Sequence, residues 1–235
     1  MNLQTQTSPE FKSIRFWPEK ERPRERLLER GPGGLSEAEL VAILLGHGTR
    51  GRDAVSLARD LIAQFGGLRT LFSAGASELC RIRGLGKAKA AAILAAAELS
   101  RRALLQNALN KDVIREPQSV LDYLYGSLRD RKIEIFKVLF LNKANCMLTA
   151  LDLFQGTVDE AAVHPREIVK AALEHFASAV ILVHNHPSGR IEPSPEDRKI
   201  TEKIAAACET VSIRVLDHII IGDNRYFSFR EAGLL

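Results

Sequence analysis

The spacing of apolar residues changes near residue 105 of this 235-residue chain. Before that point, apolar positions follow a helical spacing in short segments, and no strand-like alternation occurs. Ser36, with Glu39 three residues later, forms a capping-box signal before LVAILL, and the alanine-rich stretch 88–103 predicts a firm helix. Glycines divide the intervening sequence into short helices, at positions 46, 48, 51, 66, 67, 75, 84 and 86. The pattern predicts a polar arm at 1–20 and an all-α domain at 21–105.

The rest of the chain has a β-rich pattern. We place a linker at 106–118, where the periodicity is lost and Pro117 interrupts the chain, and a short helix at 119–128. The remaining elements are strands at 135–141 and 147–154 joined by a turn at 142–145, a helix from Pro165, a strand at 179–183, a helix from Pro195, and strands at 213–221 and 225–229. The order β-β-α-β-α-β-β predicts an α/β (α+β) domain at 119–235, with a mixed sheet flanked by helices.

Charge is distributed unevenly between these halves. Residues 1–105 carry 17 Lys and Arg against 11 Asp and Glu, which is +6, whereas residues 106–235 carry 16 against 18, which is −2. The two values sum to the net charge of +4. A basic first half beside a mildly acidic second half predicts two domains with different partners.

Cysteine usage and hydropathy indicate a cytoplasmic protein without a membrane anchor. Cys80, Cys146 and Cys208 are widely separated and show neither disulfide nor zinc-ligand spacing, as expected in a reducing compartment. No apolar stretch reaches the roughly 18 residues that a membrane span needs. The N-terminal sequence lacks the basic-then-apolar order of a secretion signal. The oligomeric state is left open.

The most informative stretch is HNHPSGRIEPSPED, residues 184–197. His184 and His186 follow the apolar strand at 179–183, and side chains two apart on a strand point to the same face. Asp197 follows eleven residues after His186. Two neutral imidazoles and one carboxylate are a usual ligand set for a catalytic zinc, with the fourth position left for water. The stretch therefore predicts an open metal site.

A purely structural interpretation stands beside this one. Ser194 suits a helix N-cap, Pro195 suits the first helical position, and an acidic Asp197 favours the positive end of the helix. The two histidines could likewise be ordinary strand residues, one of them hydrogen-bonded in a turn. Because the three residues occur together, we favour ligation.

These residues resemble a known family. The spacing of His184, His186, Ser194 and Asp197 is similar to that of the JAMM (MPN-plus) metalloprotease signature. The sequence HNHPSG, with GTVDEAAVHPRE before it and LDHIIIG after it, resembles that of the bacterial RadC family. The first half, through RPRERLLERGPGGLSEAELVAILLGHGTRG, resembles that family's N-terminal region.

The resemblance implies a role for each motif residue. His184, His186 and Asp197 would hold one Zn²⁺ per chain, and Ser194 would polarise the carbonyl oxygen of the substrate. Glu134, at the start of EIFKVLFL, matches the general acid/base, with Glu160, Glu167 and Glu192 as competitors. The implied activity is hydrolysis of an amide bond in a protein or peptide substrate that the sequence does not identify.

The neighbouring polar residues receive weaker interpretations. Asn185 should point to the opposite face of the strand and serve packing. His218 is a candidate for orienting a ligand from behind, although a satisfied core histidine is the simpler interpretation. The other histidines, His47, His164 and His175, lack ligand spacing, and only His164 is a candidate to line the cleft.

A basic hairpin in the first half carries a separate hypothesis. Residues 79–90, LCRIRGLGKAKA, have the Gly-apolar-Gly turn and flanking helices that resemble a helix-hairpin-helix motif. Its glycine turn would let backbone N–H groups approach a DNA phosphate. The alternative is a tight turn with ordinary basic surface. The residues concerned are Arg81, Arg83, Gly84, Gly86, Lys87 and Lys89.

Three functions are thus open. The first is a zinc metallopeptidase or isopeptidase with a helical appendage. The second is a DNA repair or recombination factor whose JAMM-like domain is a binding module. The third, an inactive JAMM scaffold, is disfavoured because a scaffold has no need of the complete His, His, Ser and Asp set.

Overall fold

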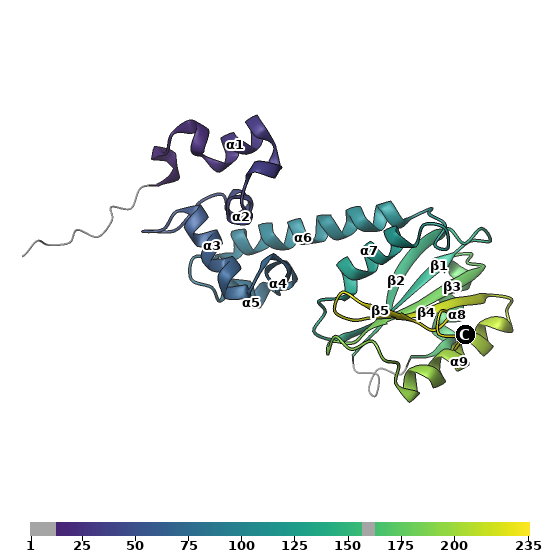
Figure 1. The fold of residues 1–235 in the computed structure, drawn as a ribbon. Helices are drawn as coiled ribbons and strands as arrows, with labels where there is room; N and C mark the ends of the chain where they lie inside the picture. The colour runs from purple at the N-terminus through teal and green to yellow at the C-terminus, as the bar shows by residue number, and fades with distance from the viewer. Residues whose placement is uncertain (1–12, 157–162) are drawn as a thin grey trace, which may run out of the picture. The chain divides into compact units, whose positions relative to one another are not determined.

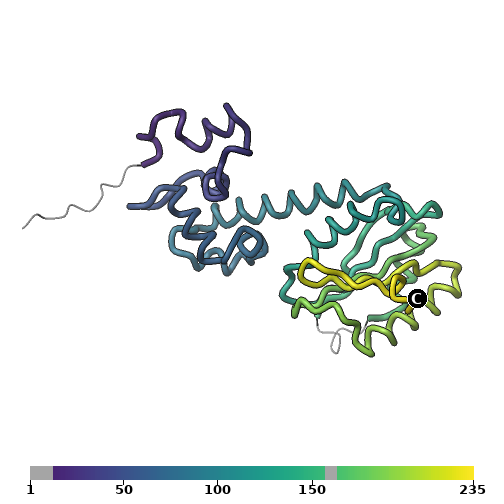
Figure 2. Tube along the Cα trace, viewed as in Figure 1, coloured from purple at the N-terminus to yellow at the C-terminus, as the bar shows by residue number. Residues whose placement is uncertain are grey.

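The chain folds into two compact units. A computed structural model describes residues 13–156 and 163–235, and the units are residues 1–98 and 99–235. Twelve residues of the expected polar arm, and the candidate Glu160, lie outside the described residues. Figure 1 labels the elements, and Figure 2 traces their connections.

The first unit is helical, as the apolar spacing predicts. Its elements are η1 (Ile14–Phe16), η2 (Glu19–Glu21), α1 (Pro23–Arg30), η3 (Pro32–Gly34), α2 (Glu37–Leu45), α3 (Ala54–Phe65), α4 (Leu68–Ser73), α5 (Ala76–Cys80) and the start of α6 (Lys87–Ala108). The predicted capping box is present, because the Ser36 hydroxyl accepts from the Glu39 amide and the Glu39 carboxylate accepts from Ser36. Asp53 caps α3 in a similar way.

Two boundaries differ from the sequence-based prediction. At the end of the expected arm, Ile14–Phe16 and Glu19–Glu21 form the short helices η1 and η2, and Ile14 and Trp17 pack against the core of the first unit. In the sequence, the polar residues around these two apolar side chains gave the segment the pattern of an arm, so this contact was not predicted.

The second difference concerns the linker at 106–118. Helix α6 continues to Ala108, because its alanines and leucines favour the helix beyond the predicted end, and the division between the units falls within it. The following segment is tied to the sheet, since Asn110 donates to the Met147 carbonyl and Val113 to that of Asn145. Neither α6 nor any other described helix has the length and apolar content that a bilayer crossing requires.

The second unit contains the predicted mixed sheet. Its elements are α7 (Pro117–Leu128), β1 (Glu134–Leu141), β2 (Met147–Gly156), α8 (Pro165–Glu174), β3 (Ala179–Asn185), α9 (Pro195–Glu209), β4 (Arg214–Ile221) and β5 (Tyr226–Ser228). The strands lie in the order β2-β1-β3-β4-β5, with β3 and β4 parallel and the other neighbours antiparallel.

Helices cover both faces of this sheet (Figure 1). Alternate residues of β1 divide between them: Ile135 and Leu139 pack with α7 and the end of α6, whereas Phe136 and Val138 pack with α8 and α9. Lys137 is buried on the α7 face, where its ammonium donates to the Tyr123 hydroxyl and pairs with Asp152. The central strands β1 and β3 are therefore buried on both sides, and the end of β3 reaches the site.

Candidate metal centre

The end of β3 places both motif histidines on the face covered by α9. His184 is the next-to-last residue of β3, and His186 follows the strand, where its amide still donates to the Ile221 carbonyl. Their Nε2 atoms lie 3.0 Å apart. His184 is 2% exposed. The alternation along the strand thus brings the two imidazoles together, as the sequence predicts.

Asp197 is both a helix cap and a neighbour of the histidines. Ser194 is the N-cap of α9, and its hydroxyl and amide donate to Oδ2 of Asp197 at 2.7 and 2.8 Å. Oδ1 of the same carboxylate lies 3.2 Å from Nε2 of His184, and Oδ2 lies 3.6 Å from Nε2 of His186. The structural and the ligand interpretations of Asp197 therefore describe one arrangement.

The ligand atoms have the separations that a small cation requires. Tetrahedral zinc with bonds of about 2.0–2.1 Å holds its ligand atoms about 3.3 Å apart. The separations of 3.0, 3.2 and 3.6 Å among the Nε2 atoms and the carboxylate oxygens lie around that value. His184, His186 and Asp197 are the group of described residues whose spacing could hold a metal ion. Two imidazole nitrogens and one carboxylate form a donor set that fits a divalent metal such as zinc.

A hydrogen-bonded chain behind the site fixes the tautomer of His184. The Thr201 hydroxyl donates its single proton to the Asp197 backbone carbonyl at 2.5 Å. Nδ1 of His218 lies 2.6 Å from the same hydroxyl oxygen and must therefore donate to it. Nε2 of His218 then accepts from Nδ1 of His184 at 2.8 Å. This network assigns a lone pair to Nε2 of His184, which faces Asp197.

His186 has the same tautomer for a different reason. Its Nδ1 lies 3.2 Å from the Arg190 carbonyl, which can only accept, so a neutral His186 presents the lone pair of Nε2 toward His184. Two imidazole lone pairs and one carboxylate therefore converge. Such a convergence needs a cation or a proton at its centre.

The pKa values follow from burial and this convergence. Burial opposes ionisation of Asp197, but hydrogen bonds from His184 and His186, when their Nε2 atoms carry a proton, and from Ser194 outweigh it and hold the pKa far below its usual range. The hydrogen bond with Asp197 raises the pKa of His186 against the effect of burial, and the charge of Glu134 contributes. Burial keeps the pKa of His218 well below its usual value, so His218 stays neutral.

Glu134 lies at the mouth of the site. Phe136 pairs with His184 in the antiparallel ladder, and continuing that register by two residues places Glu134 opposite His186. Asn185, buried on the other face, accepts from the Ile135 amide at 2.9 Å and donates to the Ile133 carbonyl at 3.1 Å. Asn185 therefore fixes the backbone on either side of Glu134.

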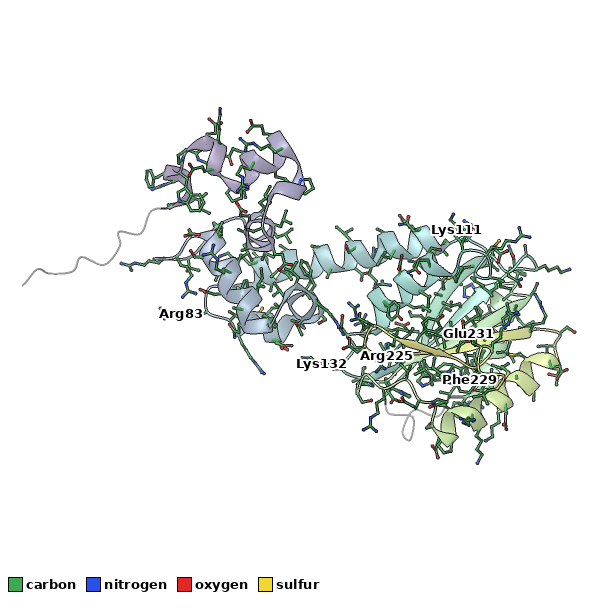
Figure 3. The ribbon with its side chains drawn as sticks, viewed as in Figure 1. Arg83, Lys111, Lys132, Arg225, Phe229 and Glu231 are labelled. Carbon is green, nitrogen blue, oxygen red and sulfur yellow. The ribbon has the colours of Figure 1, made fainter. Side chains whose placement is uncertain are left out.

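A cavity of about 880 Å³ opens beside His186. Glu134 and Glu192 both line this cavity, but of these two only Glu134 comes from β1, which pairs with β3, the strand that carries His184. Arg225, labelled in Figure 3, and Arg190 bring positive charge to its wall. Glu167, another candidate for the general acid/base, forms an ion pair with Arg166 on α8 at 3.2 Å.

The remaining predicted residues fall into two groups. Ser194 gives its single proton to Asp197, so polarising a substrate carbonyl would require this hydroxyl to rotate. The other three histidines lie outside the metal group: His164 occupies the N-cap position of α8 and contacts the ring of Phe154, His175 packs on Phe140, and His47 belongs to the first unit. Thr201 was missed by sequence reasoning, although its position one helical turn after Asp197 was a usable signal.

The basic hairpin lies between α5 and α6. Arg81, Arg83 and Lys87 are exposed, and Arg83 points away from the unit in Figure 3. Gly84 has φ of +96°, and a Cβ there would lie 2.5 Å from the Thr49 side chain, whereas Gly86 has open space. Lys89 differs from the prediction, because it is buried and its ammonium donates to the Gly48 and Gly84 carbonyls. It therefore holds the turn in place instead of offering a surface charge.

Comparison with known proteins covers nearly the whole chain. A family described as a RadC-like JAB domain matches residues 114–234, and a family described as UPF0758 N-terminal matches residues 14–91. A UPF0758 protein of Aeromonas hydrophila is 51% identical over 223 residues, which cover 95% of this chain and 100% of the relative. UPF0758 proteins of Marinomonas sp. and Shewanella amazonensis are 49% and 48% identical, with 95% and 94% of this chain covered and 100% and 98% of the relatives. The chain belongs to the UPF0758 family, and its second unit is a RadC-like JAB domain with a candidate metal site.

Proposed function

We propose that the chain is a zinc-dependent hydrolase that cleaves an amide bond, in a peptide or an isopeptide linkage. The observation that carries this proposal is the convergence of two imidazole lone pairs and one carboxylate, beside an open cavity. One zinc ion held by His184, His186 and Asp197 would supply Lewis acidity toward water and toward the carbonyl oxygen of the substrate.

The residues around the ligands have separable tasks. Glu134, opposite His186, takes a proton from the attacking water and returns it to the departing amine. Ser194 orients the Asp197 carboxylate and, after rotation, would donate to the oxygen of the substrate carbonyl. His218 and Thr201 hold His184 in the ligating tautomer.

Burial argues for a working site over an inert scaffold. Asp197 and His218 are 2% and 0% exposed, and a protein that needed only a stable helix start would gain nothing from three converging ligand atoms there. Replacing these buried polar side chains by apolar ones would remove the cost of taking them out of water, and would stabilise such a scaffold. The presence of the complete set supports metal binding.

Metal content and proteolysis test the proposal together. Purified protein should contain one equivalent of zinc by elemental analysis, and His186→Ala should lose it, with His164→Ala as the matched control. Glu134→Gln should retain zinc but lose cleavage in a peptide-library screen, whereas Glu192→Gln on the same cavity should remain active. Full zinc occupancy in His186→Ala would refute the ligand assignment.

A second candidate function is sequence-independent DNA contact. The exposed Arg81, Arg83 and Lys87 around the glycine turn favour it, because they offer positive charge beside accessible backbone. Binding of the full chain to duplex DNA should weaken with salt and with the double substitution Arg81→Gln and Arg83→Gln. Absence of binding at low salt would eliminate this function.

A further inference from the structure

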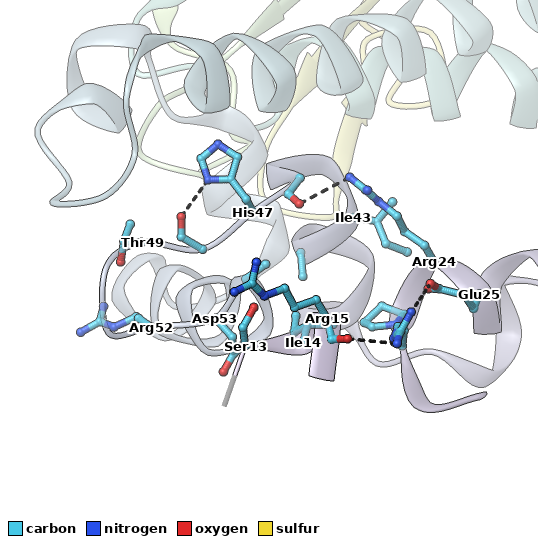
Figure 4. A pocket seen from close by; sticks show the side chains of 16 residues that line it. Ser13, Ile14, Arg15, Arg24, Glu25, Ile43, His47, Thr49, Arg52 and Asp53 are labelled. Atoms are coloured by element: carbon cyan, nitrogen blue, oxygen red, sulfur yellow. Dashed lines mark hydrogen bonds and ion pairs between the residues drawn. The ribbon is translucent and has the colours of Figure 1, made fainter. Parts of the chain in front are cut away.

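A second cavity lies in the first unit. Its volume is about 460 Å³, within the range of small-molecule sites. It is bounded by η1, the start of α1, the end of α2 and the loop at 46–53, as Figure 4 shows. All its lining residues lie between positions 13 and 54.

Three arginines give this cavity its character. Arg15 contacts the ring of Phe16 through its guanidinium, 4.7 Å from the centroid, and among the described residues no ion pair of Arg15 is found. Within the described part of the chain, Arg24 donates to the Gly46 carbonyl alone, at 3.4 Å (Figure 4). Arg52 pairs with Asp60, but both side chains are about half exposed, so the pair is weak. These guanidinium groups retain donors for a ligand.

The carboxylates in the same wall do not cancel that charge. Both oxygens of Asp53 accept from Ser56, at 2.8 Å each, to cap α3. Glu25 pairs with Arg22 at 3.6 Å. Arg22 itself serves the backbone, because its guanidinium donates to the Arg15 and Trp17 carbonyls. An excess of positive charge therefore remains at the cavity.

The loop that carries Arg52 is held in one conformation. Thr49 and Arg52 exchange backbone hydrogen bonds of 2.8 and 3.0 Å, and a Cβ at Gly48 would lie 2.0 Å from the Arg52 carbonyl oxygen. The buried Lys89 donates to the Gly48 carbonyl from α6. A loop that is already fixed loses little conformational entropy when a ligand binds.

We propose that this cavity binds a phosphate group carried on an apolar or aromatic body, as in a nucleoside phosphate. Guanidinium groups match phosphate oxygens in geometry and charge. The apolar side chains of Ile14, Pro23 and Ile43 line the same cavity and offer a surface for the attached group. A free nucleotide and the phosphorylated end of a nucleic-acid strand share this chemistry.

Equilibrium dialysis of the full chain tests the site with three probes: ADP, inorganic phosphate and 5′-phosphorylated thymidine trinucleotide. ADP should bind more tightly than inorganic phosphate, because only ADP uses the apolar wall. The double substitution Arg15→Gln and Arg24→Gln should weaken binding about a hundredfold, at roughly tenfold for each charge-assisted contact. Arg30→Gln, on α1 but outside the cavity, is the matched control and should bind as the parent does.

The outcomes separate the two ligand sources. Tighter binding of ADP than of the trinucleotide identifies a free nucleotide, and the reverse order identifies a strand end. Trp17, the single tryptophan, follows Arg15 by two residues, and its fluorescence gives a local signal of occupancy. Thermal unfolding of the double variant checks that the unit stays folded. Binding that survives both substitutions, or no binding of any probe at low salt, would overturn the proposal.

Discussion

Thr201 offers a sharp test of how the metal ligands are held. Thr201→Val keeps the shape of the side chain but removes the hydroxyl that links the Asp197 carbonyl to His218. Nδ1 of His218 then has a proton and no partner at a position that is 0% exposed. An unsatisfied buried donor costs about 1–3 kcal/mol.

The protein can avoid that cost only by weakening the metal site. If His218 moved its proton from Nδ1 to Nε2, it would donate to Nδ1 of His184. His184 would then carry its own proton on Nε2, which is the atom that binds the metal. Part of the cost therefore appears as lost affinity, and we expect zinc to bind about 10- to 100-fold more weakly, or about 1.4–2.7 kcal/mol.

Competition with a chromophoric chelator measures this zinc affinity. Thr201→Ser keeps the hydroxyl and should retain the parental affinity. Thr210→Val makes the same chemical change at the exposed end of α9, where the hydroxyl donates to the Ala207 carbonyl, and should leave zinc binding unchanged. A Thr201→Val variant that bound zinc as tightly as the parent, while its metal-free form unfolded at a lower temperature, would show that Thr201 serves stability alone.

Three further predictions concern other parts of the chain. Glu134→Gln should lower the rate of hydrolysis about 10²- to 10⁴-fold at unchanged zinc content, measured by steady-state kinetics on a cleaved peptide, and equal rates would remove Glu134 from the mechanism. Gly84→Ala should lower the free energy of unfolding by about 1–3 kcal/mol in urea, because φ is positive and the Cβ meets Thr49, whereas Gly86→Ala should change it little. Burial raises the pKa of the Cys208 thiol to about 11, so iodoacetamide at pH 8 should label Cys80 in the native protein and Cys208 only after denaturation.

The order of strands and helices in the second unit could be predicted from the sequence because its signals are local. Apolar runs bounded by turn residues define β1 through β5, and Ser194 with Pro195 marks the start of α9. The closeness of His184 and His186 also follows from local geometry, since a strand places alternate side chains together.

Contacts between distant segments could not be predicted in this way. Lys89 looked like a surface charge, but its partner carbonyl at Gly48 lies 41 residues away in the chain. Thr201 and His218 meet across α9 and β4, and neither carries a local signal that names the other. The end of α6 was misplaced because the loss of apolar periodicity at 106–108 outweighed a helix propensity that in fact continued.

The double use of Asp197 bears on how quickly the centre can be loaded. Its carboxylate is held by Ser194 through the start of α9, which forms whenever the unit folds. Residues that are already ordered lose little freedom when they bind, so uptake of the ion requires no rearrangement of the first turn of α9, which carries the carboxylate. Loading should therefore be limited by the arrival and dehydration of the ion. The metal-free protein would remain ready to be reloaded after each loss of metal.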